Sequence, residues 1–127
     1  MVKIKFRSIL SIIISSALII CISGCDNNRT FSGSKTSNDN QFLMDFDVLN
    51  STVNSKMFLS RGEKIETTIE IKKGVLDIIV KNENGTIAYQ CNDVESCKFI
   101  IEIEEEGTYT FYIIGSKAKG IVYFIKS

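Results

Sequence analysis

The sequence predicts an all-β fold, a single antiparallel β-sandwich of about seven or eight strands. From residue 41 onward, apolar and polar residues alternate with a period of two, which is typical of half-buried strands. Glycine and asparagine separate the alternating segments, and no segment shows a sustained helical period. Short, regularly spaced strands with turns between them favour a sandwich or a barrel.

Residues 1–24 are predicted to be an export signal. Lys3, Lys5 and Arg7 precede an uncharged, mostly apolar stretch that runs from residue 8 to residue 22. A membrane span needs about 20 apolar residues, and this stretch is shorter and ends in small residues. These features favour a cleaved signal peptide over a membrane anchor.

The signal ends in Ile22-Ser23-Gly24-Cys25, which resembles the bacterial lipobox. The resemblance implies cleavage between Gly24 and Cys25, diacylation of the Cys25 thiol and a protein anchored on the extracytoplasmic face of the membrane. The alternative is a plain signal peptide, or an uncleaved anchor, with a chance cysteine. The bias toward Ile, Lys and Asn resembles proteins from AT-rich genomes and, with the lipobox, indicates a Gram-positive bacterium.

Residues 25–40 are predicted to be the lipidated cysteine and a flexible polar linker, because Phe31 is their only large apolar residue. The sandwich domain is expected to cover residues 41–127. Removal of residues 1–24 leaves all 15 acidic residues and 12 of the 15 basic ones, so the net charge becomes −3. This charge argues against a nucleic-acid partner. The sequence has no glycine-rich phosphate-binding loop, so no nucleotide site is expected.

The alternation also predicts which side chains form the core. Tyr109 is expected to face the core, and so are Ile121, Tyr123 and Ile125 in the last strand. The turn signals include Asn84-Gly85, since both residues tolerate positive φ. The expected strands cover residues 42–48, 57–60, 65–71, 75–80, 86–91, 99–103, 109–113 and 121–125.

The spacing of several glycine and apolar residues resembles two families of small β-modules. The residues that carry this resemblance are Phe58-Leu59-x-x-Gly62, Gly74-x-Leu76-x-Ile78-x-Val80, Asn84-Gly85 and Gly107-x-Tyr109-x-Phe111. Together they are similar to bacterial pre-peptidase C-terminal modules and to the jelly-roll folds called GOLD domains. The resemblance implies a jelly-roll-like accessory or interaction module. The acidic calcium-site cluster of the first family is missing, because Val75-Leu76-Asp77-Ile78 keeps a single acid.

Cys91 and Cys97 remain after removal of the signal and acylation of Cys25. In an oxidising compartment, an even pair of cysteines predicts a disulfide, here across the mouth of a hairpin. The second alternative is a redox-active pair, but Cys91 and Cys97 lack the tight Cys-x-x-Cys spacing of such pairs. The third alternative is two free thiols.

The sequence offers little catalytic chemistry, and we expect no enzyme activity. Histidine is absent, so the commonest general base and metal ligand is missing. The clustered acids at residues 102–106 are expected to form a solvated strand edge. Asn92, Asp93 and Glu95 offer oxygen ligands, but calcium needs six to eight, so a polar turn is the favoured interpretation and no metal is expected. No cofactor is expected apart from the lipid on Cys25.

The sequence therefore predicts a non-catalytic binding module at the cell envelope. The leading hypothesis is a protein partner that contacts outward-facing apolar residues, with Ile79, Ile100 and Tyr112 as the candidate interaction surface. The alternatives are a module that binds wall polysaccharide through its loops, an accessory or regulatory subunit of a secreted hydrolase or transporter, and a structural lipoprotein with no tight ligand.

Overall fold

The computed structural model describes residues 30–127. The predicted signal and lipobox fall outside these described residues. Within residues 30–127 there is no helix, and hence none long and apolar enough to span a membrane. The strands are β1 (Phe31–Ser37), β2 (Gln41–Leu49), β3 (Thr52–Leu59), β4 (Lys64–Asn82), β5 (Ile87–Cys91), β6 (Cys97–Glu102) and β7 (Gly107–Lys126).

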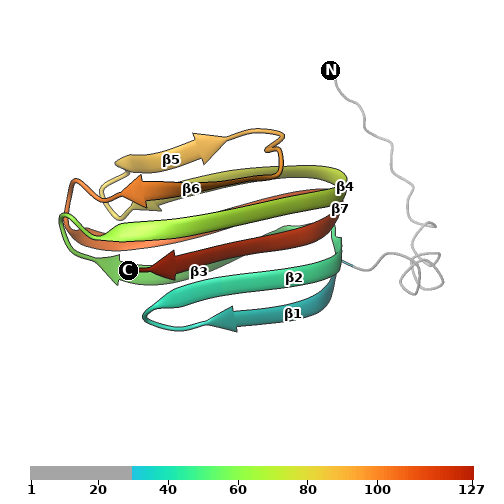
Figure 1. Ribbon diagram of the computed structural model, residues 1–127, viewed down its shortest axis with the longest axis horizontal. Coiled ribbons are helices and arrows are strands. Elements are labelled where there is room, and N and C mark those ends of the chain that lie inside the picture. Colours follow the sequence, from blue (N-terminus) through green and yellow to red (C-terminus); the bar gives the residue numbers. More distant parts are fainter. Residues whose placement is uncertain (1–29) are drawn as a thin grey trace, which may run out of the picture.

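All strand pairs are antiparallel and form one continuous network, because β4 and β7 are long enough to take part in two layers. One layer, the five-stranded sheet, contains β1, β2, the C-terminal half of β7, the N-terminal half of β4, and β6. The other, the four-stranded sheet, contains β3, the N-terminal half of β7, the C-terminal half of β4, and β5. The prediction of an all-β antiparallel sandwich is confirmed (Figure 1).

Both long strands bend at the same end of the sandwich, where β1 begins (Figure 1). In β4, the register shifts on either side of Lys73, and Gly74 has a φ of 74°. A Cβ atom on Gly74 would collide with the carbonyl oxygen of Lys117 in the bend of β7. Glycine is therefore required where the two bends touch.

The core lies between the two sheets and is rich in phenylalanine. Phe42 of the five-stranded sheet packs edge-on against Phe111 of the four-stranded sheet, with ring centroids 6.5 Å apart. Phe124 contacts both, at 6.2 Å from Phe42 and 4.8 Å from Phe111. All three side chains are fully buried. These close-packed rings join the two layers and contribute to the apolar burial that stabilises the fold.

The structure differs from the predicted strands in three places. Residues 65–71 and 75–80 are one strand, and so are residues 109–113 and 121–125, because each glycine segment between them bends a strand without ending it. Residues 31–37, predicted to belong to the flexible linker, form β1 and pair with β2. The predicted β5–β6 hairpin is wrong, since β5 pairs with one half of β4 and β6 with the other.

Candidate functional site

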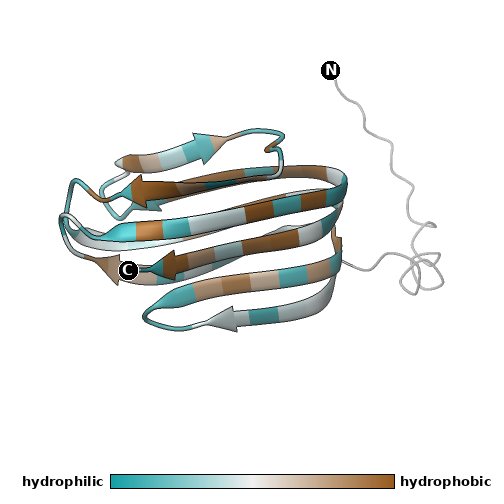
Figure 2. Ribbon diagram, in the orientation of Figure 1, coloured by the Kyte–Doolittle hydropathy of each residue, from teal (hydrophilic) through white to brown (hydrophobic). Residues whose placement is uncertain are grey.

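A strip of apolar side chains lies on the outer face of the five-stranded sheet. Leu43 and Tyr123 are directly opposite each other on β2 and β7, and Ile121 and Ile125 flank Tyr123 on the same face. Leu43, Ile121 and Tyr123 are half-buried, and Ile125 is 38% exposed. We call these four residues the apolar strip. The hydrophobic residues along the C-terminal half of β7 can be followed in Figure 2.

Polar and charged side chains border the apolar strip on both sides. On β4, Glu70 lies opposite Ile121, Thr68 opposite Tyr123 and Glu66 opposite Ile125. On β2, Asp45 lies on the other side of Ile121. An apolar centre with a charged rim is the usual anatomy of a protein–protein interface.

The three residues of the predicted interaction surface do not share one face. Ile79 and Tyr112 are directly opposite each other on the outer face of the four-stranded sheet. The Lys81 ammonium lies 5.6 Å from the centroid of the Tyr112 ring, so a charge covers part of this pair. Ile100 is 58% exposed, but it lies on β6 in the five-stranded sheet, where Glu66 separates it from Ile125. The structure therefore brings Ile79 and Tyr112 together and places Ile100 beside the apolar strip.

Sequence reasoning missed Tyr123, because it assigned the last strand to the wrong face. Tyr109, Phe111 and Ile113 face the core in the first half of β7, whereas Val122 and Phe124 do so in the second half. The inward face changes from odd to even positions at the bend, where the strand passes from one sheet to the other. The prediction that Ile121, Tyr123 and Ile125 point into the core is therefore wrong.

Cys91 and Cys97 are free thiols and are not within disulfide distance. The predicted disulfide is absent because the two cysteines end and begin strands of different sheets. Two residues along each strand, the rings of Tyr89 and Phe99 contact each other, with centroids 4.8 Å apart. Burial, a hydrogen bond with Cys91 and the charges of both thiolates raise the pKa of Tyr89 to about 12. Burial and the neighbouring Cys91 also raise the pKa of Cys97.

The loop that joins β5 to β6 packs against β4. The Asp93 amide donates to Asp77 Oδ1 at 2.7 Å, and the Val94 amide donates to the Leu76 carbonyl at 2.8 Å. Val94 is buried and the Ser96 hydroxyl accepts from the Ile71 amide at 2.9 Å. The loop thus closes the gap between the two sheets beside the bend of β4.

Across residues 30–127, no group of three or more His, Cys, Asp or Glu side chains is placed to hold a metal ion.

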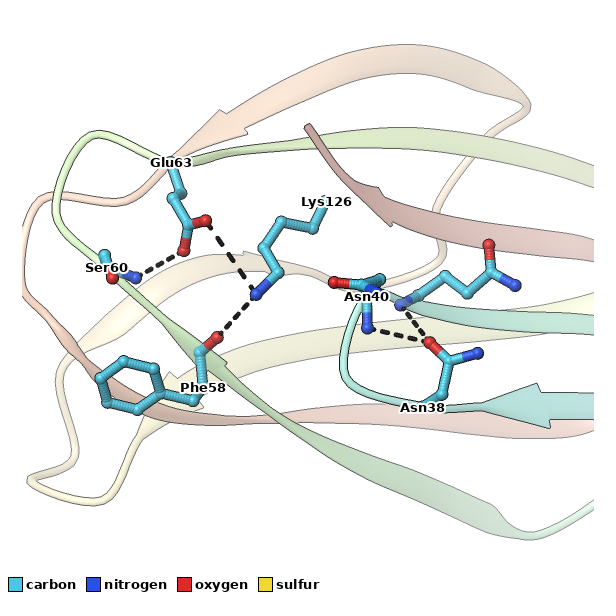
Figure 3. Close-up of polar contacts among 7 residues, drawn as sticks. Asn38, Asn40, Phe58, Ser60, Glu63 and Lys126 are labelled. Carbon is cyan, nitrogen blue, oxygen red and sulfur yellow. Dashed lines mark hydrogen bonds and ion pairs between the residues drawn. The ribbon is translucent and has the colours of Figure 1, made fainter.

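At the end of the sandwich opposite the bends, polar contacts stabilise two turns, and Lys126 joins the end of β7 to the β3–β4 turn. Glu63 Oε1 accepts from the Ser60 amide at 2.7 Å, and Lys126 Nζ donates to the Phe58 carbonyl at 3.3 Å (Figure 3). Lys126 also lies 4.0 Å from Glu63 Oε2, and Asn38 Oδ1 accepts from the amide of Asn40 at 2.8 Å. Shallow hollows at this end are lined mainly by exposed glutamates and by Arg61, Thr86 and Tyr109.

No protein-family model matches the chain, and no curated protein matches it. The solved structures that match include one described as "CBM4 structure and function". It is 10% identical, the match covers 81% of this chain and 79% of that chain, and the TM-score is 0.40. A likeness at this level concerns the β-rich architecture and carries no argument about function.

Proposed function

We propose that the protein is a non-catalytic binding module, anchored by a lipid on Cys25 at the extracytoplasmic face of a bacterial membrane, and that the apolar strip binds a protein partner. The observation that carries the proposal is the strip itself. Four apolar side chains occupy central strands of an open sheet face and have charged neighbours on either side. An exposed apolar patch with a polar rim is typical of an interaction surface.

The composition of the apolar strip favours a protein over a glycan. Sugars usually stack on flat aromatic rings, and Tyr123 is the single ring among three aliphatic side chains. In protein interfaces, an aromatic anchor such as Tyr often carries much of the binding energy, and the apolar contacts around it exclude water. The absence of histidine from the sequence agrees with a role in binding rather than catalysis.

Photo-crosslinking in intact cells tests this proposal. The photoreactive residue p-benzoylphenylalanine replaces Tyr123 in one variant and Tyr112, on the opposite face, in a matched control. We expect a discrete crosslinked protein band from position 123 and none from position 112, and mass spectrometry of the band identifies the partner. Equal crosslinking from both positions, or none from 123, would contradict the assignment of the strip.

A second pair of variants separates contact from folding. Ile125→Lys places a charge in the apolar strip and is expected to remove the crosslink, whereas Ile87→Lys changes another exposed isoleucine, 52% exposed on β5, and should leave it unchanged. Purified protein-free sacculi provide the glycan test. If the protein pellets with sacculi in a salt-resistant way and Tyr123→Ala does not, the ligand of the apolar strip is a wall polysaccharide and not a protein.

A further inference from the structure

The N-terminal end of the described chain is fixed at the end of the sandwich that contains both bends. The Thr30 carbonyl accepts from the Asn50 amide at 2.8 Å and from the Ser51 hydroxyl at 3.3 Å. Asn50 Oδ1 in turn accepts from the Lys117 amide, in the bend of β7, at 3.0 Å. A chain that arrives from Cys25 therefore enters the domain beside the two bends.

Four lysines lie at these bends, and we call this end of the sandwich the lysine end. Lys72 and Lys73 belong to the bend of β4, and Lys117 and Lys119 to the bend of β7. Lys73 and Lys119 are opposite each other in the β4–β7 ladder. Lys72, Lys73 and Lys117 are exposed, so their ammonium groups are available to an external anion.

The acidic groups near the lysine end do not cover these three exposed lysines with ion pairs. The Asp47 carboxylate lies 3.9 Å from the Lys119 ammonium. It is not within ion-pair distance of Lys72, Lys73 or Lys117. Asp93 and Glu95 belong to the β5–β6 loop, whose hydrogen bonds to Ile71 and Asp77 bracket the bend of β4. Among the described residues, neither carboxylate forms an ion pair with Lys72 or Lys73.

At the lysine end, the four lysines outnumber the three nearby acids, Asp47, Asp93 and Glu95. The opposite end of the sandwich, which we call the acidic end, has a net negative charge. Its four turns and adjoining strand ends carry seven acidic and three basic residues, a net charge of −4. The acidic ones are Asp39, Glu63, Glu83, Glu102, Glu104, Glu105 and Glu106, and the basic ones are Arg61, Lys64 and Lys126. The charge of the domain is therefore distributed unevenly along its strands.

Chain length limits which end can approach the membrane. Five residue steps separate Cys25 from Thr30, and these span at most about 18 Å when fully extended. The nine residues of β2, which run from one end of the sandwich to the other, cover about 30 Å. With the Cys25 lipid in the bilayer, the lysine end stays within about 18 Å of the headgroups, and the tether is too short for the sandwich to stand upright on its acidic end.

We infer that the lysine end docks on the anionic lipid headgroups of the membrane to which the protein is anchored, with the acidic end directed away from it. The inference rests on the proposed anchor at Cys25. Anionic lipids attract each nearby lysine, and the attraction acts within about 8 Å at physiological salt. The lipid supplies the membrane affinity, and the charge distribution sets the orientation of the apolar strip above the bilayer.

Single tryptophans report this orientation, because the sequence contains none. Ser116→Trp marks the lysine end and Glu105→Trp the acidic end. Each acylated protein is reconstituted into vesicles of equal parts phosphatidylglycerol and phosphatidylcholine that contain a nitroxide-headgroup lipid. We expect strong quenching of Ser116→Trp and little quenching of Glu105→Trp, with weaker quenching of Ser116→Trp in vesicles of phosphatidylcholine alone.

Charge reversal completes the test. Lys72→Glu, Lys73→Glu and Lys117→Glu together should weaken headgroup contact by about a hundredfold and abolish the quenching of Ser116→Trp, while the protein still floats with the vesicles. Lys35→Glu, Lys56→Glu and Lys98→Glu make the same charge change on exposed positions elsewhere and should leave the quenching intact. Flotation of Ser116→Trp without quenching while all the lysines are present, or quenching that survives Lys72→Glu, Lys73→Glu and Lys117→Glu, overturns the docking. Loss of flotation in the unsubstituted protein overturns the anchor itself.

Discussion

Two asparagines hold turns in the same way but differ in burial. Asn82 Oδ1 accepts from the amides of Asn84 and Thr86, both at 2.9 Å, and Asn82 is 5% exposed. Asn38 Oδ1 accepts from the amides of Asn40 and Gln41 at 2.8 and 3.1 Å, but in an exposed turn. Water can replace the Asn38 side chain far more easily than the buried Asn82 side chain.

The pair makes a controlled test of that difference. Asn82→Ala is expected to lower the free energy of unfolding by about 2 kcal/mol, because it removes two hydrogen bonds and leaves a partly buried gap. Asn38→Ala should lower it by less than about 1 kcal/mol. Urea denaturation of both variants measures the two values, and equal losses would contradict a role for burial at Asn82.

Tyr89 links the stability of the fold to alkaline pH. Its pKa is about 12 in the folded protein, against 10.0 for an unperturbed tyrosine. Because the raised value favours the neutral phenol in the fold, the associated stability is present below pH 10 and is lost as the pH rises toward 12.

Tyr89→Phe should therefore flatten the decline of stability between pH 10 and pH 12, since phenylalanine has no proton to lose. Denaturant unfolding of the wild-type protein and Tyr89→Phe at several pH values across this interval measures the change. If both proteins lose stability in parallel over the whole interval, the pKa of Tyr89 is not raised in the folded protein.

At the level of elements, the two bent strands decide what the sequence could predict. Period-two alternation identifies the strand segments and most of the core correctly, because inward and outward residues alternate within each half of β4 and β7. Alternation alone does not fix which positions face inward after a bend. Ile69 and Leu76 are both buried although they are seven positions apart, an odd offset that places two residues of one straight strand on opposite faces. The same change of face in β7 explains why the alternation wrongly predicts Tyr123 in the core.

The first strand was missed because its residues are poor strand formers. Its sequence, Phe-Ser-Gly-Ser-Lys-Thr-Ser, has the composition of a linker, and Gly33 lies at a register shift opposite β2. Pairing with β2 supplies the stability that local preference lacks. Within residues 31–40, which were predicted as linker, residues 31–37 form β1 and residues 38–40 form the turn that leads into β2.

The bend of β4 depends on the missing side chain of Gly74. Gly74→Ala is expected to destabilise the protein by more than about 1 kcal/mol, because the new methyl group meets the Lys117 carbonyl and alanine disfavours a positive φ. Gly62→Ala is the matched control, since Gly62 also has a positive φ, 88°, but open space around it. Thermal unfolding compares them, and a smaller effect at Gly74 than at Gly62 would show that the bends do not need to touch.

At the level of the whole molecule, the membrane anchor is the first property to test. Cys25→Ala removes the predicted acylation site and is expected to release the protein from membranes and abolish lipid labelling. Cys21→Ala, four residues earlier and within the predicted signal, should leave both unchanged. Fractionation of cells and metabolic labelling with a fatty acid measure the outcome, and membrane association of Cys25→Ala would contradict the lipobox assignment.

The incorporation of residues 31–37 into β1 has a mechanical consequence. A partner bound at the apolar strip and a lipid in the bilayer would pull the domain in different directions, and the load would pass through β1 and its ladder with β2. Because β1 begins at the end nearest the proposed anchor, such tension would act along the strand axis, across hydrogen bonds that are perpendicular to it. The seven paired residues of β1 would share such a shearing force rather than yield one at a time, so the strand would serve as a strain-resistant attachment between the proposed anchor and the sandwich.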